Sequence, residues 1–252
     1  MQTTVIPSVK NVLLSLLRAD FTTQWRNRRS VVLILLIPVA ILLSWKSLIP
    51  VKGGPFVIAN AITIGLNAIG LMGYSNTIAR DRDKGIFQRL RVAPLTAWSI
   101  MASRITVQLA MILLLAAIVF IAGHYQDNIT LSPAGYALGF AMAFVGGAVY
   151  LGLGQAIVGF IKNPETVNAV TRLVYIVFIM VGMFAELGAM GEKVKNIVKW
   201  SPYGTVKQIV AAGMEPAMWN HHQNDTMALL VTIGYAIVFS ALGIKWFKWS
   251  SK

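Results

Sequence analysis

The sequence predicts an all-α protein that crosses a membrane several times. The 252 residues are 56% hydrophobic and only 12% charged, whereas a soluble domain of this length has about 25% charged residues. The apolar residues are also gathered into six long stretches, each near the ~20 residues that a helix needs to cross a hydrocarbon core. Composition and stretch length together indicate a polytopic membrane protein.

The six apolar stretches are the expected membrane-spanning helices, and Pro38 should kink the first of them. They lie at residues 30–49, 56–79, 100–123, 135–161, 167–187 and 226–247. In the fourth stretch small residues recur at every fourth position, a spacing that lets another helix approach closely. These residues are Gly135, Gly139, Ala143 and Gly147. We interpret the row as a packing surface and not as a ligand site.

Residues 1–29 are predicted to form an amphipathic helix that lies in the headgroup plane of the membrane. Apolar residues recur there in one i, i+4 row, and polar residues occupy the opposing row. The apolar residues expected at the membrane interface are Leu13, Leu17, Phe21 and Trp25. We do not expect a cleavable signal peptide, because the first apolar run begins only near Val31 and no small-x-small cleavage site precedes a soluble domain.

The net charge of +13 would suggest nucleic acid as a partner in a soluble chain. Here the basic residues lie mainly beside the apolar stretches, where they orient the chain and meet anionic lipid headgroups. We therefore expect membrane lipids as partners, and no nucleic acid. If the amino terminus is cytoplasmic, the cytoplasmic segments carry more Lys and Arg residues than the external loops. This bias predicts a multi-pass protein of the inner (cytoplasmic) membrane with both termini cytoplasmic.

One charged interruption, at residues 80–97, separates the second stretch from the third. It carries five basic residues, Arg80, Arg82, Lys84, Arg89 and Arg91. Together they would cost over ~12 kcal/mol at a bilayer centre, so the segment must lie in water. After Gly85 the apolar residues recur at helical spacing, and Pro94 limits any continuation of the helix. The pattern predicts a short amphipathic helix that packs against another surface.

Residues 83–95, with the sequence DKGIFQRLRVAPL, resemble the E-K-G-T-x-x-R-L-R-A-T-P-L stretch of ABC-2 type membrane permeases. Asp83 replaces the usual Glu, and Val92 and Ala93 replace small or hydroxyl residues. A basic loop beside a membrane is also an ordinary orientation signal. That reading explains the charge, but not the Lys-Gly turn, the apolar spacing and the Pro-Leu end together.

In that family the stretch is the cytoplasmic loop between the second and third helices, and it docks on the ATPase subunit as a coupling helix. The resemblance therefore implies that residues 30–252 form an ABC-2 transmembrane domain whose coupling loop contacts an ATPase. The implied coupling residues are Arg80, Arg82, Lys84, Gly85, Phe87, Arg89, Leu90, Arg91, Pro94 and Leu95. Among them, Phe87, Leu90 and Leu95 are expected to fill an apolar groove on the ATPase. Arg89 and Arg91 would pair with its acidic rim.

Residues 188–225 form the one long connection, and long connections with structure of their own are often functional. An amphipathic turn, a Ser-Pro step and a short apolar stretch follow one another there. Neither the amphipathic turn nor the apolar stretch is long enough to cross a membrane. This order resembles the external re-entrant hairpin of ABC-2 permeases, although Glu186 stands where the family often has Pro. Glu186 is expected either to extend to the external headgroups or pair with a nearby lysine such as Lys193, or to lie at the outer mouth of the substrate path. At the outer mouth it would favour cationic cargo or stabilise the closed hairpin.

The sequence contains no G-x-x-x-x-G-K-[ST] loop to cradle ATP phosphates, no cysteine, and no catalytic constellation. His221 and His222 are adjacent and so point apart, which does not suit a metal site. We therefore expect a transport subunit that is not an enzyme and holds no cofactor, with ATP and Mg bound by a partner.

The resemblance implies one half of a permease dimer, identical or related to its partner, bound to two copies of a separate ATPase. It implies export of a drug, antibiotic, peptide or lipid-linked molecule. The alternative is a secondary transporter or channel, which would need ionisable groups at mid-membrane, and the sequence has almost none.

Overall fold

The computed structural model describes residues 9–92, 97–221 and 224–247, and within these ranges the chain is helical without strands. The predicted all-α class is thereby confirmed. The α-helices are α1 (Val9–Arg26), α2 (Arg28–Ser44), α3 (Ile49–Lys52), α4 (Gly54–Asn67), α5 (Asn76–Asp83), α6 (Ile86–Val92), α7 (Ala97–Asp127), α8 (Pro133–Phe160), α9 (Pro164–Glu186), α10 (Gly191–Lys199), α11 (Pro202–Met214) and α12 (Asp225–Trp246). The 3-10 helices η1 (Lys46–Leu48) and η3 (Pro216–Met218) and the π-helix η2 (Ala68–Ser75) complete the set.

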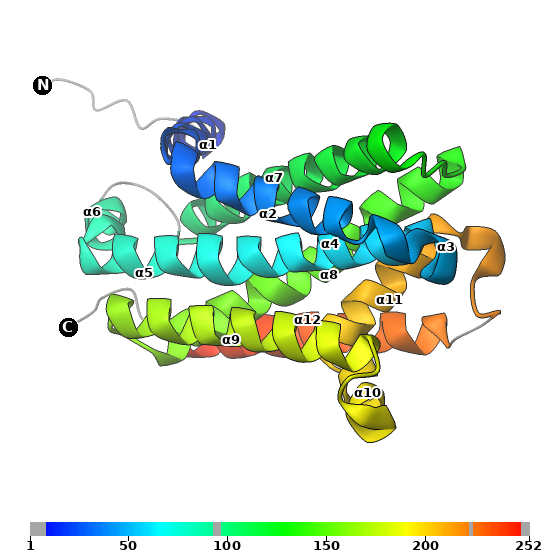
Figure 1. Ribbon diagram of the computed structural model, residues 1–252. Helices are drawn as coiled ribbons and strands as arrows, with labels where there is room; N and C mark the ends of the chain where they lie inside the picture. The colour runs from blue at the N-terminus through cyan, green and yellow to red at the C-terminus, as the bar shows by residue number, and fades with distance from the viewer. Residues whose placement is uncertain (1–8, 93–96, 222–223, 248–252) are drawn as a thin grey trace, which may run out of the picture.

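The long helices run side by side in one bundle, and α1 lies across their direction, seen nearly end-on in Figure 1. Both chain ends are at the same end of the bundle, together with α1, α5 and α6 (Figure 1). We call this the terminus-bearing end. The other end, where α3 and α10 lie, is called the opposite end (Figure 1).

In the part of the chain that the structure describes, five helices are long and apolar enough to cross a membrane. They are Gly54–Asp83, Ser99–Asp127, Pro133–Phe160, Pro164–Glu186 and Asp225–Trp246. The first predicted span corresponds to α2, which has 17 residues and passes the same test only together with α1, at a bend of 63°. Among the described residues the structure thus has five helices that could cross a membrane, or six when the bent pair is counted, and they overlap the apolar stretches.

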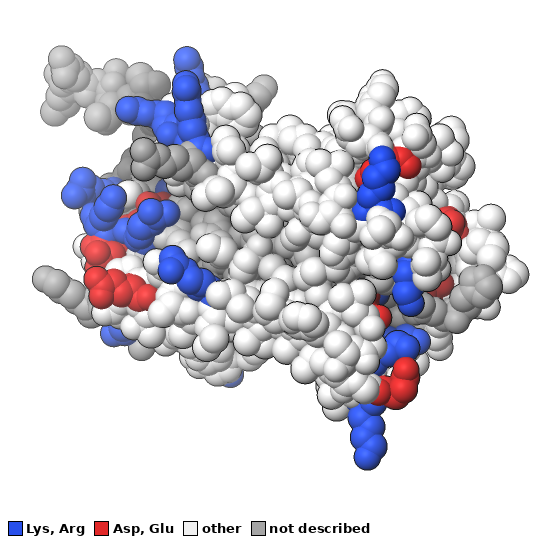
Figure 2. All heavy atoms as spheres, in the orientation of Figure 1, with Lys and Arg blue, Asp and Glu red and all other residues white. Residues whose placement is uncertain are grey.

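The surface agrees with a membrane setting. In Figure 2 the charged side chains gather at the two ends of the molecule, and the broad middle of the visible face is almost entirely uncharged. Large apolar side chains of α9 are exposed along this middle, including Leu173 at 63% and Ile176 at 48%. Exposed apolar area of this extent is costly in water and favourable in lipid.

The second span is the centre of the bundle. It runs without interruption through α4, η2 and α5, and 89% of its most apolar window is buried inside the protein. The helix ends at Asp83 and not near residue 79, so Arg80 and Arg82 belong to its last turn and not to a loop. The π-helix η2 in the middle of this span packs directly on α8. Short π-helical segments often mark functional sites.

The predicted row of small residues in α8 is a packing surface. A Cβ atom added at Gly135 would lie 2.3 Å from the Met214 carbonyl oxygen, and one at Gly147 would lie 2.4 Å from the Ile112 side chain. Helix α11 can approach α8 this closely because Gly135 has no Cβ atom to meet the α11 backbone, and at Gly147 the end of the Ile112 side chain of α7 fills the space that a Cβ atom would take. The close approach stabilises the bundle through van der Waals contact.

The connection at residues 188–225 contains two short helices, α10 with nine residues and α11 with 13. Both are too short to cross a membrane. Helix α11 begins at a Ser-Pro step, where the Ser201 hydroxyl accepts a hydrogen bond from the Gly204 amide and so caps the helix. It then inserts between α4, α8 and α12, and the Tyr203 hydroxyl donates to Asn60 Oδ1 at 2.8 Å.

Candidate functional site

The turn between α5 and α6 forms the surface of the terminus-bearing end. Gly85 has a φ of +66°, in the left-handed region that favours glycine. The amides of Lys84 and Gly85 donate to the carbonyls of Arg80 and Arg82, at 3.0 and 3.1 Å, which is a common way to end a helix. The chain then reverses, and α6 begins at Ile86, where the apolar spacing predicts a helix.

Arg82 lies inside the protein, with only 1% of its surface exposed. Its guanidinium donates hydrogen bonds to three backbone carbonyls at the end of α8. The acceptors are those of Val158 at 2.7 Å, Ile161 at 2.6 Å and Lys162 at 2.8 Å. A cation at a helix carboxyl terminus satisfies carbonyls that lack partners and interacts favourably with the helix dipole. In this conformation Arg82 is therefore not available to a partner protein.

Phe87 is buried as well, with 0% exposure. Its ring packs edge-on against that of Phe247, at a centroid distance of 6.0 Å, so α6 is anchored to the residue that follows α12. Leu90 is half-buried against the same core. The expectation that the Phe87 ring fills a groove on a partner is thus at odds with the structure, because this ring faces the chain's own interior.

The exposed basic residues of the turn are Arg80, Lys84 and Arg89. Arg80 donates to the Asn76 carbonyl within α5, at 3.2 Å. Arg91 lies in the last turn of α6, and its side chain is outside the described part of the structure. Pro94 and Leu95 are outside the described residues altogether, so their predicted roles stay predictions.

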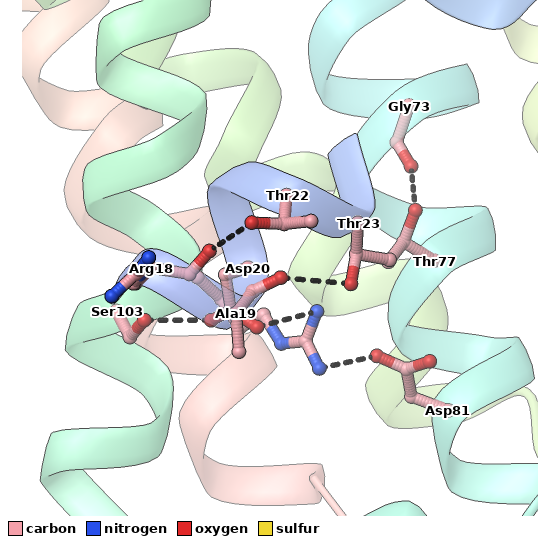
Figure 3. Close-up of polar contacts among 10 residues, drawn as sticks. Arg18, Ala19, Asp20, Thr22, Thr23, Gly73, Thr77, Asp81 and Ser103 are labelled. Carbon is pink, nitrogen blue, oxygen red and sulfur yellow. Dashed lines mark hydrogen bonds and ion pairs between the residues drawn. The ribbon is translucent and has the colours of Figure 1, made fainter. Parts of the chain in front are cut away.

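A buried ionic network joins three helices beneath this surface (Figure 3). The guanidinium of Arg104 on α7 pairs with Asp20 Oδ1 of α1 at 3.1 Å and with Asp81 Oδ2 of α5 at 2.7 Å. The Ser103 hydroxyl donates to Asp20 Oδ2 at 2.6 Å. Between 10% and 14% of each of the three charged side chains is exposed. Because one guanidinium pairs with two carboxylates, the position of each of the three helices depends on its ion pairs with the others.

The environment of the network is polar. Burial raises the pKa of the Asp20 carboxyl, and the charge of Arg104 and the hydrogen bond from Ser103 oppose that shift. A cavity of about 190 Å³ lies next to the network, between α1, η2, α5 and α7, lined mostly by polar side chains. It is large enough for several water molecules. Tyr74, on the wall of the cavity, donates to Gln155 Oε1 of α8 at 2.7 Å.

Sequence reasoning missed this network. Asp20 stands on the helix face that carries Leu16 toward the core, not on the predicted row of Leu13, Leu17, Phe21 and Trp25. In that row Phe21 and Trp25 are 42% and 61% exposed, as befits residues that face lipid. One available signal was Arg104, a cation inside a predicted span that needs an anionic partner.

A second buried ion pair lies at the opposite end, between Glu186 at the end of α9 and Lys207 of α11. The side chains are 13% and 14% exposed, and the Lys207 ammonium also lies 4.7 Å from the centroid of the Phe56 ring. The partner of Glu186 is therefore Lys207 and not the exposed Lys193. The pair attaches the re-entrant helix α11 to the fifth span.

The fold and these sites define a polytopic helical membrane protein with a short surface helix anchored at one end and a re-entrant hairpin at the other. The chain matches the family described as ABC-2 type transporter over residues 11–214. This match covers most of the chain, which therefore belongs to the ABC-2 type transporter family as a membrane transport component. No curated protein matches the chain.

Proposed function

We propose that this chain is the permease subunit of an ABC exporter and that α6, with the α5–α6 turn, receives the motion of a separate ATPase. The observation that best supports this proposal is that the segment has one exposed, basic side and one side buried in the protein. Lys84 and Arg89 are exposed on its outer side, whereas Phe87 and Arg82 are buried beneath it. A contact surface that must transmit force needs both an accessible side and a rigid attachment.

The attachments give the motion a route into the bundle. Arg82 connects α5 to α8, the ring of Phe87 connects α6 to the end of α12, and Arg104 connects α5 to α1 and α7. A displacement of the turn would therefore reach several helices together. These side chains act as positioning residues in the proposal, and Lys84, Arg89 and Arg80 supply the outer surface.

The proposed assembly has two copies of the ATPase, which bind ATP and Mg, and a second permease subunit, identical or related. In this assembly the protein lies in the inner membrane, and its terminus-bearing end is cytoplasmic. Helix α1 lies along the membrane surface, with Phe21 and Trp25 in lipid. The cargo would be a drug, antibiotic, peptide or lipid-linked molecule. The orientation of α1 across the bundle and the exposure of its aromatic residues support the placement of α1 along the membrane surface.

The proposal is tested by charge reversal on the exposed side of the segment. Arg89→Glu should weaken association with the co-expressed ATPase about tenfold or more and slow export, because a surface charge that meets an acidic rim becomes repulsive. The thermal midpoint of the subunit should hardly change. Leu90→Asp is a less decisive variant, because half-buried Leu90 also supports the packing of α6.

Lys193→Glu is the matched control, since Lys193 is also an exposed cation but lies at the opposite end. It should leave association and export at the wild-type level. Hydrolysis of ATP by the purified subunit alone, or equal effects of the two reversals, would contradict the proposal. Export that persists without any ATPase would instead favour a secondary transporter or channel.

A further inference from the structure

Helix α1 has one firm attachment to the bundle. In its described part, residues 11–26, Asp20 is the only buried residue. Leu16 is half-buried against the core. Contacts of half-buried leucines add little between helices in a membrane, because lipid tails are as apolar as the side chains that they replace. The ion pair of Asp20 with Arg104 is therefore the main link that holds α1 in place.

The cavity of about 190 Å³ beside Arg104 lies under the same helix. Helix α1 turns a polar face toward it, made of Asp20, Thr23, Gln24 and Asn27 at helical spacing. Thr77 of α5 also lines the cavity, and Figure 3 shows it with Thr23 among the polar side chains of this region. Polar faces that meet across such a space are joined through water and not by close packing. Separation of α1 from the bundle therefore exposes mainly polar groups.

The ionic network is arranged so that Asp20 can leave it. The guanidinium of Arg104 pairs with both Asp20 and Asp81, so the loss of Asp20 leaves it paired with Asp81 at 2.7 Å. A buried cation without any partner would be strongly unfavourable, and the second carboxylate avoids that cost. Arg104 Nε has no hydrogen-bond partner in the described part of the chain. Water that enters the cavity can supply one.

The connection between α1 and α2 provides a hinge. Helix α1 ends at Arg26 and α2 begins at Arg28, so Asn27 is the single residue between them. Its backbone is not helical, with a φ of −82° and a ψ of 55°, and the two helices are bent by 63°. Lids commonly turn about a few residues at the end of an element, which absorb the change in backbone angles. Helix α1 can thus swing about Asn27 as one piece.

We propose that α1 is a lid, hinged at Asn27 and fastened by Asp20 to Arg104, that opens the cavity to water and small polar solutes at the terminus-bearing end. The structure shows the closed state. In the open state Arg104 keeps Asp81 as its partner, and Asp20 is in water. The inference goes beyond the proposed function, because motion of the lid requires neither ATP nor a partner ATPase.

The test measures the access of a small, uncharged, water-soluble thiol reagent to the cavity in the purified full-length chain. The sequence has no cysteine, so Thr77→Cys places one thiol on the cavity wall and Gln88→Cys places one on the exposed side of α6. Thr77→Cys should react about tenfold more slowly, because labelling of a covered site follows how often the cover opens. Adding Asp20→Asn should raise the rate at Thr77→Cys about tenfold and leave the rate at Gln88→Cys unchanged, since it releases the lid.

Two controls separate opening of the lid from other effects. Asp81→Asn removes a carboxylate from the same network but leaves Asp20 on Arg104, so it should not open the lid. Because it also removes a negative charge near the thiol, it accounts for the effect of charge on thiol reactivity. Thr63→Cys, at a position of α4 with 0% exposure, should stay unlabelled in every variant.

A second measurement reports the position of α1 directly. Thr23 of α1 and Thr77 of α5 line the same cavity, so a short bifunctional thiol reagent should join Thr23→Cys to Thr77→Cys. Asp20→Asn should lower the yield of this cross-link, because α1 then spends less time on the bundle. Asp81→Asn should leave the yield unchanged.

Three results would overturn the inference. Unchanged labelling or unchanged cross-linking in the Asp20→Asn variant would show that Asp20 does not fasten a lid. Equal increases in labelling with Asp20→Asn and Asp81→Asn would show an effect of charge alone. Labelling of Thr63→Cys in the Asp20→Asn variant would show that the whole bundle loosens. None of these results bears on ATPase coupling, so failure here and failure of the proposed function are distinguishable.

Discussion

The guanidinium of Arg82 donates a hydrogen bond of 2.6 Å to the carbonyl of Ile161, and this contact joins the last turn of the second span to the end of α8. Two further carbonyls of the same segment accept hydrogen bonds from Arg82. A buried cation with three backbone acceptors is part of the interior, although its neighbours Arg80 and Lys84 are exposed.

The first prediction concerns Arg82. Arg82→Gln should destabilise the protein by about 2–4 kcal/mol, because a shorter amide cannot reach three carbonyls and leaves buried acceptors without donors. The thermal midpoint in detergent measures the effect. The matched variant Arg89→Gln alters an exposed cation of the same segment and should change the midpoint little. Similar midpoints for the two variants would contradict the buried role of Arg82.

The second prediction concerns the network of Arg104. Arg104→Met should lower stability by about 3–5 kcal/mol, because it leaves the carboxylates of Asp20 and Asp81 buried and without a cation. Replacing both acids by asparagine in the same chain should restore part of the loss. Denaturation of the single, double and triple variants measures the coupling between these sites. Additive losses would show that the three residues act independently.

The third prediction concerns the re-entrant hairpin. Glu186→Gln should lower the thermal midpoint and loosen α11, because Lys207 is then buried without its carboxylate. The double variant Glu186→Gln with Lys207→Met should recover stability. Hydrogen exchange in α11 and the thermal midpoint are the measurements. If Glu186→Gln leaves both unchanged but alters export or cargo preference, Glu186 acts on the substrate path and not as a link to α11.

The fourth prediction concerns the contact of the second span with α8. A Cβ atom added at Gly154 would lie 2.5 Å from the Gly70 carbonyl oxygen, so Gly154→Ala should cost about 1–3 kcal/mol through overpacking. At Gly234 of α12 nothing lies within 4 Å. Gly234→Ala should be neutral or stabilise by up to about 1 kcal/mol through helix propensity. Equal midpoints for the two variants would show that η2 and α8 are less tightly packed.

The positions of the spans could be predicted from sequence because the length of an apolar run is a local property and a bilayer imposes a fixed thickness. The helix that starts at Ile86 and the turn at Gly85 were predictable for a similar reason, since both depend on residues within one or two turns. The row of small residues at Gly135 and Gly147 also predicted close packing, although not which helices approach it.

The roles of the charged residues were not predictable in the same way. Arg82 and Arg89 are of one residue type in one segment, yet the first is buried and the second exposed, because only the arrival of the α8 terminus decides which arginine meets three carbonyls. Asp20 and Arg104 are far apart along the chain. Glu186 and Lys207 are separated in sequence by α10.

By itself the sequence determined an all-α membrane protein of the ABC-2 type, because hydrophobic run length, a glycine turn and a short motif act locally. Only the tertiary structure decided which cations are internal links and which are exposed at the surface. The physical reason is that a buried charge is stable only where its counter-charge or acceptors are brought within a few ångströms, and distant segments of the chain meet at that range only in the folded bundle.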